Sequence, residues 1–160
     1  MLFMGKKINQ EEIMNIVLAT DHAGFDLKES VKDFLLYNGY KVKDFGASTY
    51  DKLDDYPDFI VPAAKYISNN NDSRGIIFGG SGQGEAISAN RFKNVRAVVY
   101  YNGPEEIVTL SRTHNNSNIL SLGARFLTIE KAKNIIKIWL STDFEGGRHL
   151  SRISKIDKLS

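Results

Sequence analysis

The sequence predicts an α/β protein whose parallel sheet is covered by helices on both faces. Short apolar runs alternate along the chain with longer segments whose apolar residues recur at helical spacing. Most of the runs are apolar at nearly every position, as expected for strands that are buried on both sides. The chain has 160 residues, of which 42% are hydrophobic, so one domain with a substantial core is expected.

Five strands are predicted from the apolar runs, at 15–20, 41–45, 75–78, 96–101 and 118–123. The second of them alternates polar and apolar residues, which indicates a less buried face or an edge position. The third is short and apolar throughout, which indicates a fully buried central strand.

Helices are expected after the strands, at 25–38, 58–68, 85–91, 102–116, 128–140 and from 148 onward. Gly39 is predicted to end the first helix. Thr128 is predicted to cap the fifth. The fifth helix is expected to turn six apolar residues inward, namely Ile129, Ala132, Ile135, Ile136, Trp139 and Leu140.

Composition excludes several classes of protein. The 21 basic and 19 acidic residues give a formal net charge of +2, which is too balanced to indicate nucleic-acid binding. No apolar run is long enough to span a bilayer, and no signal-peptide pattern is present, so no membrane partner is expected. The absence of cysteine excludes disulfides, zinc–thiolate sites and thiol nucleophiles, and it is compatible with a cytoplasmic location.

Residues 1–13 show no clear period and precede the first strand. They are expected to form an N-terminal arm or extension. No repeat, low-complexity tract or interdomain linker follows, so residues 14–160 are expected to form a single domain that includes the final helix.

The segment from Arg74 to Arg91 combines a strand, a glycine-rich loop and the start of a helix. Four glycines, at 79, 80, 82 and 84, form this glycine loop. Its backbone N–H groups can point inward without a Cβ in the way, and the helix start adds free N–H groups and a positive dipole end. The segment is therefore predicted to hold negative charge. Glu85 stands at the mouth of this site, where it either caps its own helix or acts as a base.

Ligands of open α/β sheets bind beyond the carboxyl ends of the strands. That rule groups Asp21 and His22 after the first strand with Glu85 after the third and Arg125 after the fifth. His114 and its neighbour Asn115 precede the fifth strand, so simple topology places them at the opposite edge. A second subunit could bring His114 and Arg125 into another chain's cleft.

Five motifs occur in one order at matching distances: DHAGF with Lys28 (21–28), DYPD (55–58), GGSGQGE with ANR (79–91), SRTHNN (111–116) and GGRH with Arg152 (146–152). Through them the chain resembles ribose-5-phosphate isomerase B, within a wider family that includes the galactose-6-phosphate isomerase subunits. The resemblance covers roughly 14–153 and is far more specific than a lone glycine motif.

The resemblance implies an aldose–ketose isomerase that acts on a phosphorylated sugar through a cis-enediolate, without metal or other cofactor. It also implies a three-layer α/β/α Rossmann-like sandwich. The implied assembly is a homodimer whose active sites mix residues of two chains, with a tetramer as the alternative. No pair of histidines has the spacing of a metal site, which agrees with a metal-free reaction.

One departure from the family pattern concerns the base. Many members carry a cysteine base where this chain has Gly79, whereas one branch uses a glutamate at the position that matches Glu85. The chain looks like that branch, so Glu85 is predicted to move the proton between C2 and C1. Backbone N–H groups from Gly80 through Gly82 to Gly84 would stabilise the enediolate oxygen, and Ser81 could shuttle a proton between O1 and O2.

The resemblance also suggests roles for the remaining site residues. His114 and Asp21 would open the sugar ring, with Asn115 near the enediolate and Tyr56 lining the sugar pocket. The phosphate needs cations in a fork geometry, for which the candidates are Arg125, Arg148 and Arg152, with assistance from His22.

Simpler interpretations stand beside these roles. Asp21 could only cap a helix, Glu85 could only be an N-terminal helix charge, and Arg148 with Arg152 could form a solvated basic face. Three functions are therefore weighed: isomerisation of ribose 5-phosphate and ribulose 5-phosphate, the same chemistry on galactose 6-phosphate or allose 6-phosphate, and a non-catalytic anion-binding module.

Overall fold

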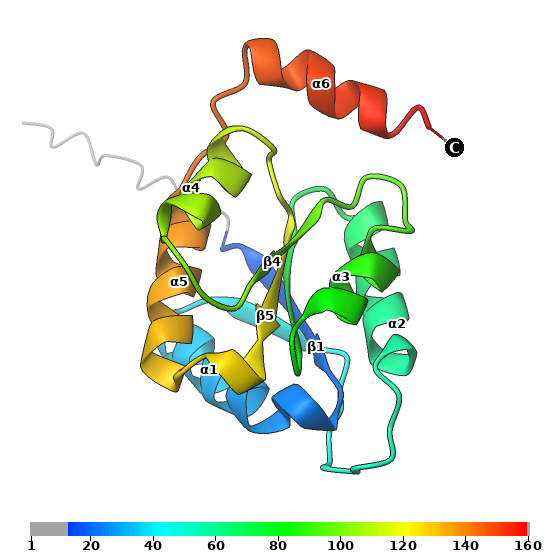
Figure 1. The fold of residues 1–160 in the computed structure, drawn as a ribbon, viewed down its shortest axis with the longest axis vertical. Coiled ribbons are helices and arrows are strands. Elements are labelled where there is room, and N and C mark those ends of the chain that lie inside the picture. The colour runs from blue at the N-terminus through cyan, green and yellow to red at the C-terminus, as the bar shows by residue number, and fades with distance from the viewer. Residues whose placement is uncertain (1–12, 160) are drawn as a thin grey trace, which may run out of the picture.

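The computed structural model describes residues 13–159 and contains a five-stranded sheet with the strand order β2-β1-β3-β5-β4 (Figure 1). All four neighbouring pairs are parallel. The strands are β1 (Asn15–Thr20), β2 (Lys41–Asp44), β3 (Arg74–Gly79), β4 (Ala97–Tyr100) and β5 (Ile119–Gly123). The predicted fold class is confirmed. The arm expected over residues 1–13 lies, except for Ile13, outside the described residues.

Helices cover both faces of the sheet (Figure 1). One face carries α1 (Phe25–Tyr37), α4 (Glu106–Thr113) and α5 (Ile129–Ser141), which pack with β1, β3, β4 and β5 in one core that contains the buried Trp139. The other face carries α2 (Pro57–Asn69) and α3 (Gln83–Ala89) in a second core. Two short 3₁₀ helices, η1 (His22–Gly24) and η2 (Ala124–Phe126), follow β1 and β5.

Three predicted details differ from the structure. The helix α3 begins at Gln83 rather than 85 because Gly82, with φ of +79°, serves as its N-cap in a left-handed conformation that glycine adopts without strain. The helix α4 begins at Glu106 rather than 102, since residues 102–104 form a turn around Gly103, with φ of +101°. Ile129 was expected to face inward but is 43% exposed, because a first-turn side chain points back beyond the end of its helix.

A final helix, α6 (Arg148–Ile156), lies outside the three layers. Figure 1 shows it across the edge of the sheet opposite η1 and η2. Two hydrogen bonds at its ends hold it there. The Glu145 backbone N–H donates to the Thr113 carbonyl at 3.1 Å, and the Asn94 backbone N–H donates to the Asp157 side-chain Oδ1 at 2.8 Å. The predicted site motifs therefore lie at both edges of the sheet.

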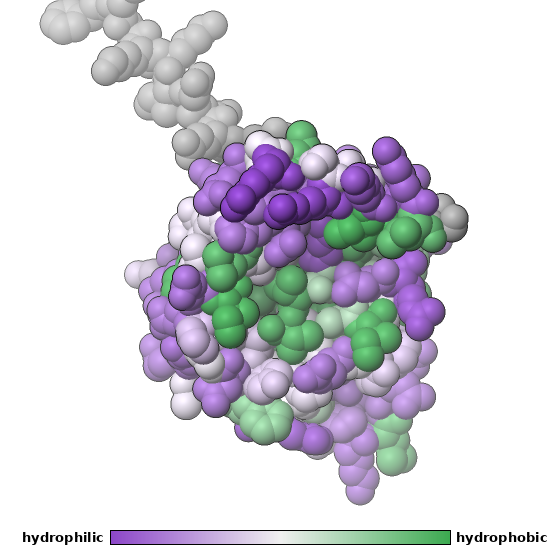
Figure 2. Space-filling view, turned by 45° about the horizontal axis from the view of Figure 1, so that its top comes forward, coloured by the Kyte–Doolittle hydropathy of each residue, from purple (hydrophilic) through white to green (hydrophobic). Residues whose placement is uncertain are grey.

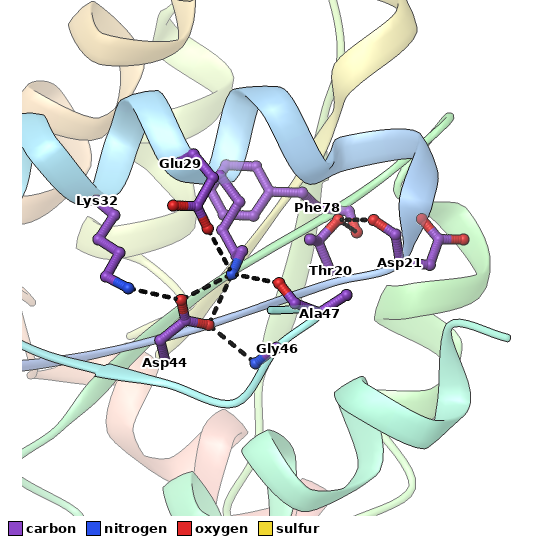
Figure 3. Close-up of polar contacts among 9 residues, drawn as sticks. Thr20, Asp21, Glu29, Lys32, Asp44, Gly46, Ala47 and Phe78 are labelled. Atoms are coloured by element: carbon purple, nitrogen blue, oxygen red, sulfur yellow. Dashed lines mark hydrogen bonds and ion pairs between the residues drawn. The ribbon is translucent and has the colours of Figure 1, made fainter. Parts of the chain in front are cut away.

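A buried lysine anchors the loop that follows β2. Lys28 is fully buried, and its Nζ donates to both carboxylate oxygens of Asp44, at 2.8 and 2.7 Å, and to the Ala47 carbonyl at 2.8 Å (Figure 3). Burial alone would raise the pKa of Asp44, but the bonds from Lys28, the Gly46 N–H and Lys32 hold it below its usual value. These bonds hold the start of the loop between β2 and α2, at residues 44–47, and none of them comes from the end of the loop next to α2.

Between residues 13 and 159, no helix combines the length and the apolar character that crossing a bilayer requires.

Candidate active site

The carboxyl ends of β1, β3 and β5 lie side by side at one edge of the sheet. Thr20 of β1 is in register with Phe78 of β3, and its Oγ1 donates a hydrogen bond to the Phe78 carbonyl oxygen at 3.1 Å (Figure 3). Gly79 at the end of β3 is in register with Gly123 of β5. The segment η1, the glycine loop and η2 therefore start from neighbouring strand ends.

Glu85 is buried at this edge, with 4% of its surface exposed. Its carboxylate lies directly over Gly79, so that a Cβ at position 79 would overlap both carboxylate oxygens. Burial raises the pKa of Glu85, the nearby Asp21 charge raises it further, and its own backbone N–H offsets part of the increase. A carboxyl group whose pKa is raised toward neutrality is suited to accept and return a proton.

Arg125 and Tyr56 flank the glycine loop. A Cβ on Gly80 would lie 3.2 Å from the Arg125 guanidinium carbon, and the Arg125 N–H donates to the Gly80 carbonyl at 3.1 Å. A Cβ on Gly84 would lie 2.7 Å from the Tyr56 ring and hydroxyl. Both side chains therefore pack closely against the glycine-loop backbone, and at Gly84 a side chain would displace Tyr56.

The middle of the loop is held from β5. Ser121 Oγ donates a hydrogen bond to the Gly82 carbonyl at 2.6 Å, which fixes the residue that precedes α3. Ser81 is partly exposed, and its Oγ accepts a hydrogen bond from the Gln83 N–H at 3.3 Å. The Ser81 hydroxyl thus stands at the open side of the loop.

Asp21 is buried, and it does cap a helix: its Oδ1 accepts a hydrogen bond from the Ala23 N–H at 2.9 Å at the start of η1. Its other oxygen, Oδ2, lies 4.0 Å from His22 Nδ1. The side chain therefore combines a capping role with a negative charge close enough to Glu85 to raise the pKa of that residue.

Asp54 contacts the site but was not among the predicted residues. Its Oδ1 accepts hydrogen bonds from the His22 backbone N–H, at 2.9 Å, and pairs with His22 Nδ1 at 2.7 Å. This hydrogen bond is the largest cause of a raised His22 pKa; burial and Arg125 lower the pKa, and the Asp21 and Asp54 charges raise it. The only signal in the sequence is that Asp54 directly precedes the DYPD motif.

His114 lies at the opposite edge, where topology places it. Its ring stacks on that of His149, with centroids 4.3 Å apart and planes inclined by 17°. His149 is buried, and its Nε2 lies 3.6 Å from Glu145 Oε2. Burial lowers the pKa of His149, as do His114 and the arginines at 148 and 152. Neutral imidazole is thus favoured at His149.

Arg112 fixes the turn that presents His114. It is 4% exposed and donates to the Ser117 carbonyl at 2.6 Å and to the Thr142 carbonyl at 3.0 Å, which ties the end of α4 to the loop before α6. Burial lowers the pKa of Arg112 to about 10, so it stays charged at neutral pH. Asn115, by contrast, is exposed.

Arg148 and Arg152 are exposed on α6, four residues apart and therefore on one face of the helix. The structure groups them with His114 and Asn115 at one edge, and it groups Asp21, His22, Tyr56, the glycine loop, Glu85 and Arg125 at the other. Within one chain the two groups do not meet (Figure 1).

Two sets of side chains have donor atoms within 4.8 Å of one another and could share a metal ion, namely His114 with Glu145 and His149, and Asp21 with His22 and Asp54. In the second set, one oxygen of Asp21 and one of Asp54 already accept hydrogen bonds, from the Ala23 N–H and from His22, so these side chains have a structural role without a metal. In the first set, the imidazole rings are stacked nearly parallel, so their nitrogen lone pairs do not converge on one point. A metal-free reaction stays a prediction of the sequence.

A parallel sheet that brings a glycine loop, a buried carboxylate and basic side chains to the carboxyl ends of its strands defines a class of α/β proteins that bind small anionic ligands there. The chain belongs to the Ribose/Galactose Isomerase family, whose sequence model matches residues 16–156.

Individual relatives agree with this membership. The chain is 38% identical over 143 residues to a probable ribose-5-phosphate isomerase B of Mycoplasma genitalium, covering 89% of this chain and 93% of the relative. The solved structure of a Mycoplasma genitalium ribose-5-phosphate isomerase B with bound ribulose 5-phosphate matches with a TM-score of 0.86 at 38% identity, over 91% of this chain and 95% of that one. A Thermotoga maritima ribose 5-phosphate isomerase matches with a TM-score of 0.85 at 41% identity, over 91% and 99%.

Proposed function

We infer that the protein is a ribose-5-phosphate isomerase, which interconverts ribose 5-phosphate and ribulose 5-phosphate. Its family membership and the relatives that carry this name support the inference. So does the relative of similar fold that was solved with bound ribulose 5-phosphate. The observation that carries the chemistry is a buried carboxylate with a raised pKa, Glu85, held beside the glycine loop.

In the proposed mechanism Glu85 removes the proton on C2 of the open-chain aldose. The electrons of that C–H bond form the C1–C2 double bond of a cis-enediolate, and the oxygen on C1 takes the negative charge. The glycine-loop N–H groups stabilise this oxygen, a contribution of about 3 kcal/mol for each well-placed donor. Glu85 then returns the proton to C1, while the hydroxyl proton of O2 passes to O1 through Ser81, which leaves the ketose.

The sugar ring must open before this step. We assign ring opening to Asp21 and to His114 of a second chain, because one chain keeps these residues at opposite edges of its sheet. Arg125 at one edge, and Arg148 with Arg152 of the second chain, would hold the phosphate. Asn115 of the second chain would lie near the enediolate.

A homodimer that joins unlike edges is supported by an apolar surface. Figure 2 shows apolar side chains gathered on the face formed by α3, β4 and α4, below the hydrophilic α6. Four large apolar residues on this face are 39–61% exposed, namely Ile87, Tyr101, Ile107 and Leu110. Large exposed apolar side chains gathered on one face are common at subunit interfaces. A tetramer and a cytoplasmic location stay predictions.

The test replaces Glu85 by glutamine, which keeps the shape and removes the base. Isomerisation of ribose 5-phosphate should fall by at least about 10²-fold, while the phosphorylated sugar still binds. For the unaltered enzyme, kcat/KM should rise with pH through the Glu85 pKa, at a midpoint above that of an ordinary glutamate, because the base acts in its ionised form. A protein with no turnover of either pentose phosphate would instead be an anion-binding module.

Comparative kinetics separate the two isomerase alternatives. The inference requires a higher kcat/KM on ribose 5-phosphate than on galactose 6-phosphate or allose 6-phosphate. A clear preference for a six-carbon substrate would retain the family and the mechanism but reassign the substrate.

A further inference from the structure

Two hydrogen bonds join His22 to a single carboxylate oxygen of Asp54, and this pair of bonds is called the clasp below. The backbone N–H of His22 lies 2.9 Å and its ring Nδ1 2.7 Å from Asp54 Oδ1. The two residues are 32 positions apart and belong to different segments, η1 and the loop before α2. Two donors on one acceptor fix both the position of the His22 backbone and the rotation of its ring.

The two bonds to His22 satisfy only one oxygen of the Asp54 carboxylate. Within residues 13–159, Asp54 Oδ2 is buried and accepts no hydrogen bond, and an unpaired buried carboxylate oxygen costs stability. The beginning of its loop is anchored separately by Lys28 and Asp44 (Figure 3). Groups that are costly to bury and yet kept often serve a function.

The surroundings of His22 show what the Asp54 carboxylate changes. His22 is faced by Asp21 from the end of β1, by Asp54, by Arg125 from η2 and by the ring edge of Tyr50, whose centroid lies 6.3 Å away. Burial and Arg125 both oppose a positive charge on the imidazole. The hydrogen bond to Asp54 outweighs them, so His22 keeps its positive charge to a higher pH than an ordinary histidine.

We propose that Asp54 is a positioning residue that holds His22 as an imidazolium, with Nδ1–H bound to the carboxylate and Nε2–H left as a donor for the substrate phosphate beside Arg125. The proposal rests on the proposed function, since it names the group that His22 binds. It assigns Asp54 no contact with substrate. Its consequence is a pH-dependent affinity: substrate binding weakens as pH rises through the His22 pKa, and without the Asp54 charge it weakens at lower pH.

The direct test follows the His22 imidazole by NMR as a function of pH. The chain has three histidines, and Asp54→Asn is compared with the unaltered protein after the His22 signal has been identified by its loss in His22→Gln. Asparagine keeps an acceptor oxygen and removes the charge, so the clasp can persist while the His22 midpoint moves to lower pH. Asp51→Asn, an equal loss of charge on the same exposed loop, is the control and should leave the midpoint unchanged.

The kinetic test separates positioning from a purely structural role. At a pH between the His22 midpoints measured for the two proteins, Asp54→Asn should raise KM for ribose 5-phosphate by about tenfold and change kcat less than about threefold, as expected for a lost interaction with a charged group. Asp54→Leu, which also removes the acceptor, should raise KM further.

Several outcomes would overturn the proposal: a His22 midpoint that Asp54→Asn leaves in place, a loss of kcat at constant KM, or an equal effect of Asp51→Asn. If Asp54→Asn did not fold, the NMR titration of the unaltered protein would still test the proposal. A His22 titration midpoint at or below that of a free histidine would contradict it. Absence of turnover in the unaltered protein would instead contradict the proposed function, and the NMR titration would still report on the clasp.

Discussion

At position 79 the lack of a side chain leaves the space that the Glu85 carboxylate occupies. The Glu85 carboxylate occupies the space into which a Cβ on residue 79 would project. A side chain at 79 and the observed carboxylate position are therefore mutually exclusive. This steric conflict explains why Gly79 and Glu85 occur together in this chain. A cysteine at position 79 would fill the space that the Glu85 carboxylate now occupies.

The first prediction at this scale is that Gly79→Ala displaces the Glu85 carboxylate. We expect kcat to fall by about 10²-fold, because a misplaced base loses most of its contribution, and the melting temperature to fall as well. In Gly79→Ala/Glu85→Ala the clash is absent, so the double variant should be more stable than Gly79→Ala alone. Thermal unfolding and steady-state kinetics measure both effects. Unchanged kcat in Gly79→Ala would show that the carboxylate acts from elsewhere.

At the scale of elements, α1 and the strand β2 are joined by a charge network rather than by apolar packing alone. Lys28 and Lys32, one turn apart on α1, both bind Asp44 Oδ2, at 2.7 and 3.0 Å (Figure 3). Lys28 is fully buried, whereas 34% of the Lys32 side chain is exposed. Two lysines with one partner and different burial allow a matched comparison.

We predict that Lys28→Met lowers the free energy of unfolding by about 3 kcal/mol, because it leaves the half-buried Asp44 and the Ala47 carbonyl without their main donor. Lys32→Met should cost less than about 1 kcal/mol, as for a solvent-exposed ion pair. Urea unfolding measures both values. Equal effects of the two substitutions would mean that burial does not govern this network.

The element boundaries also show where sequence patterns are weakest. The periodic interiors of α1, α2 and α5 were predicted, and the Thr128 cap is confirmed by a hydrogen bond from the Lys131 N–H to Thr128 Oγ1 at 3.1 Å. The starts of α3 and α4 were wrong by two and four residues. In both places a glycine with positive φ sets the boundary, and a glycine's φ is not encoded in apolar periodicity.

At the scale of the whole molecule, the proposed site residues are divided between two opposite edges of the sheet. Glu85 lies at the carboxyl edge and His114 at the edge under α6, so the proposed site, which uses both residues, would need two chains joined through unlike edges. In a closed dimer with twofold symmetry, each chain would contribute its carboxyl edge to one site and its α6 edge to the other, so two equivalent sites would form.

The prediction at this scale is complementation. Glu85→Gln and His114→Asn should each be inactive alone. After subunits have exchanged in an equal mixture, half of the dimers are mixed, and one of the two sites in each is intact, so about a quarter of full activity should return. Activity is measured before and after exchange, with each variant exchanged against itself as the control. Failure to recover activity after proven exchange would contradict a shared site.

The sequence by itself determined the succession of strands and helices along the chain and the residues that follow each strand end. Both depend on local chemistry: apolar periodicity, caps and glycine clusters act over a few residues. Once the sheet is parallel, topology also assigns each motif to an edge, so the separation of Glu85 from His114 could be predicted.

Only the tertiary structure determined the partners of those motifs. The pairing of His22 with Asp54, the stacking of His114 on His149 and the burial of Lys28 against Asp44 join residues from different segments. Such contacts depend on the path of a loop and on which groups lose water when elements pack, and neither quantity has a signature in the order of residues. The same physical reason explains why Asp54 was missed: its role follows from its position beside His22.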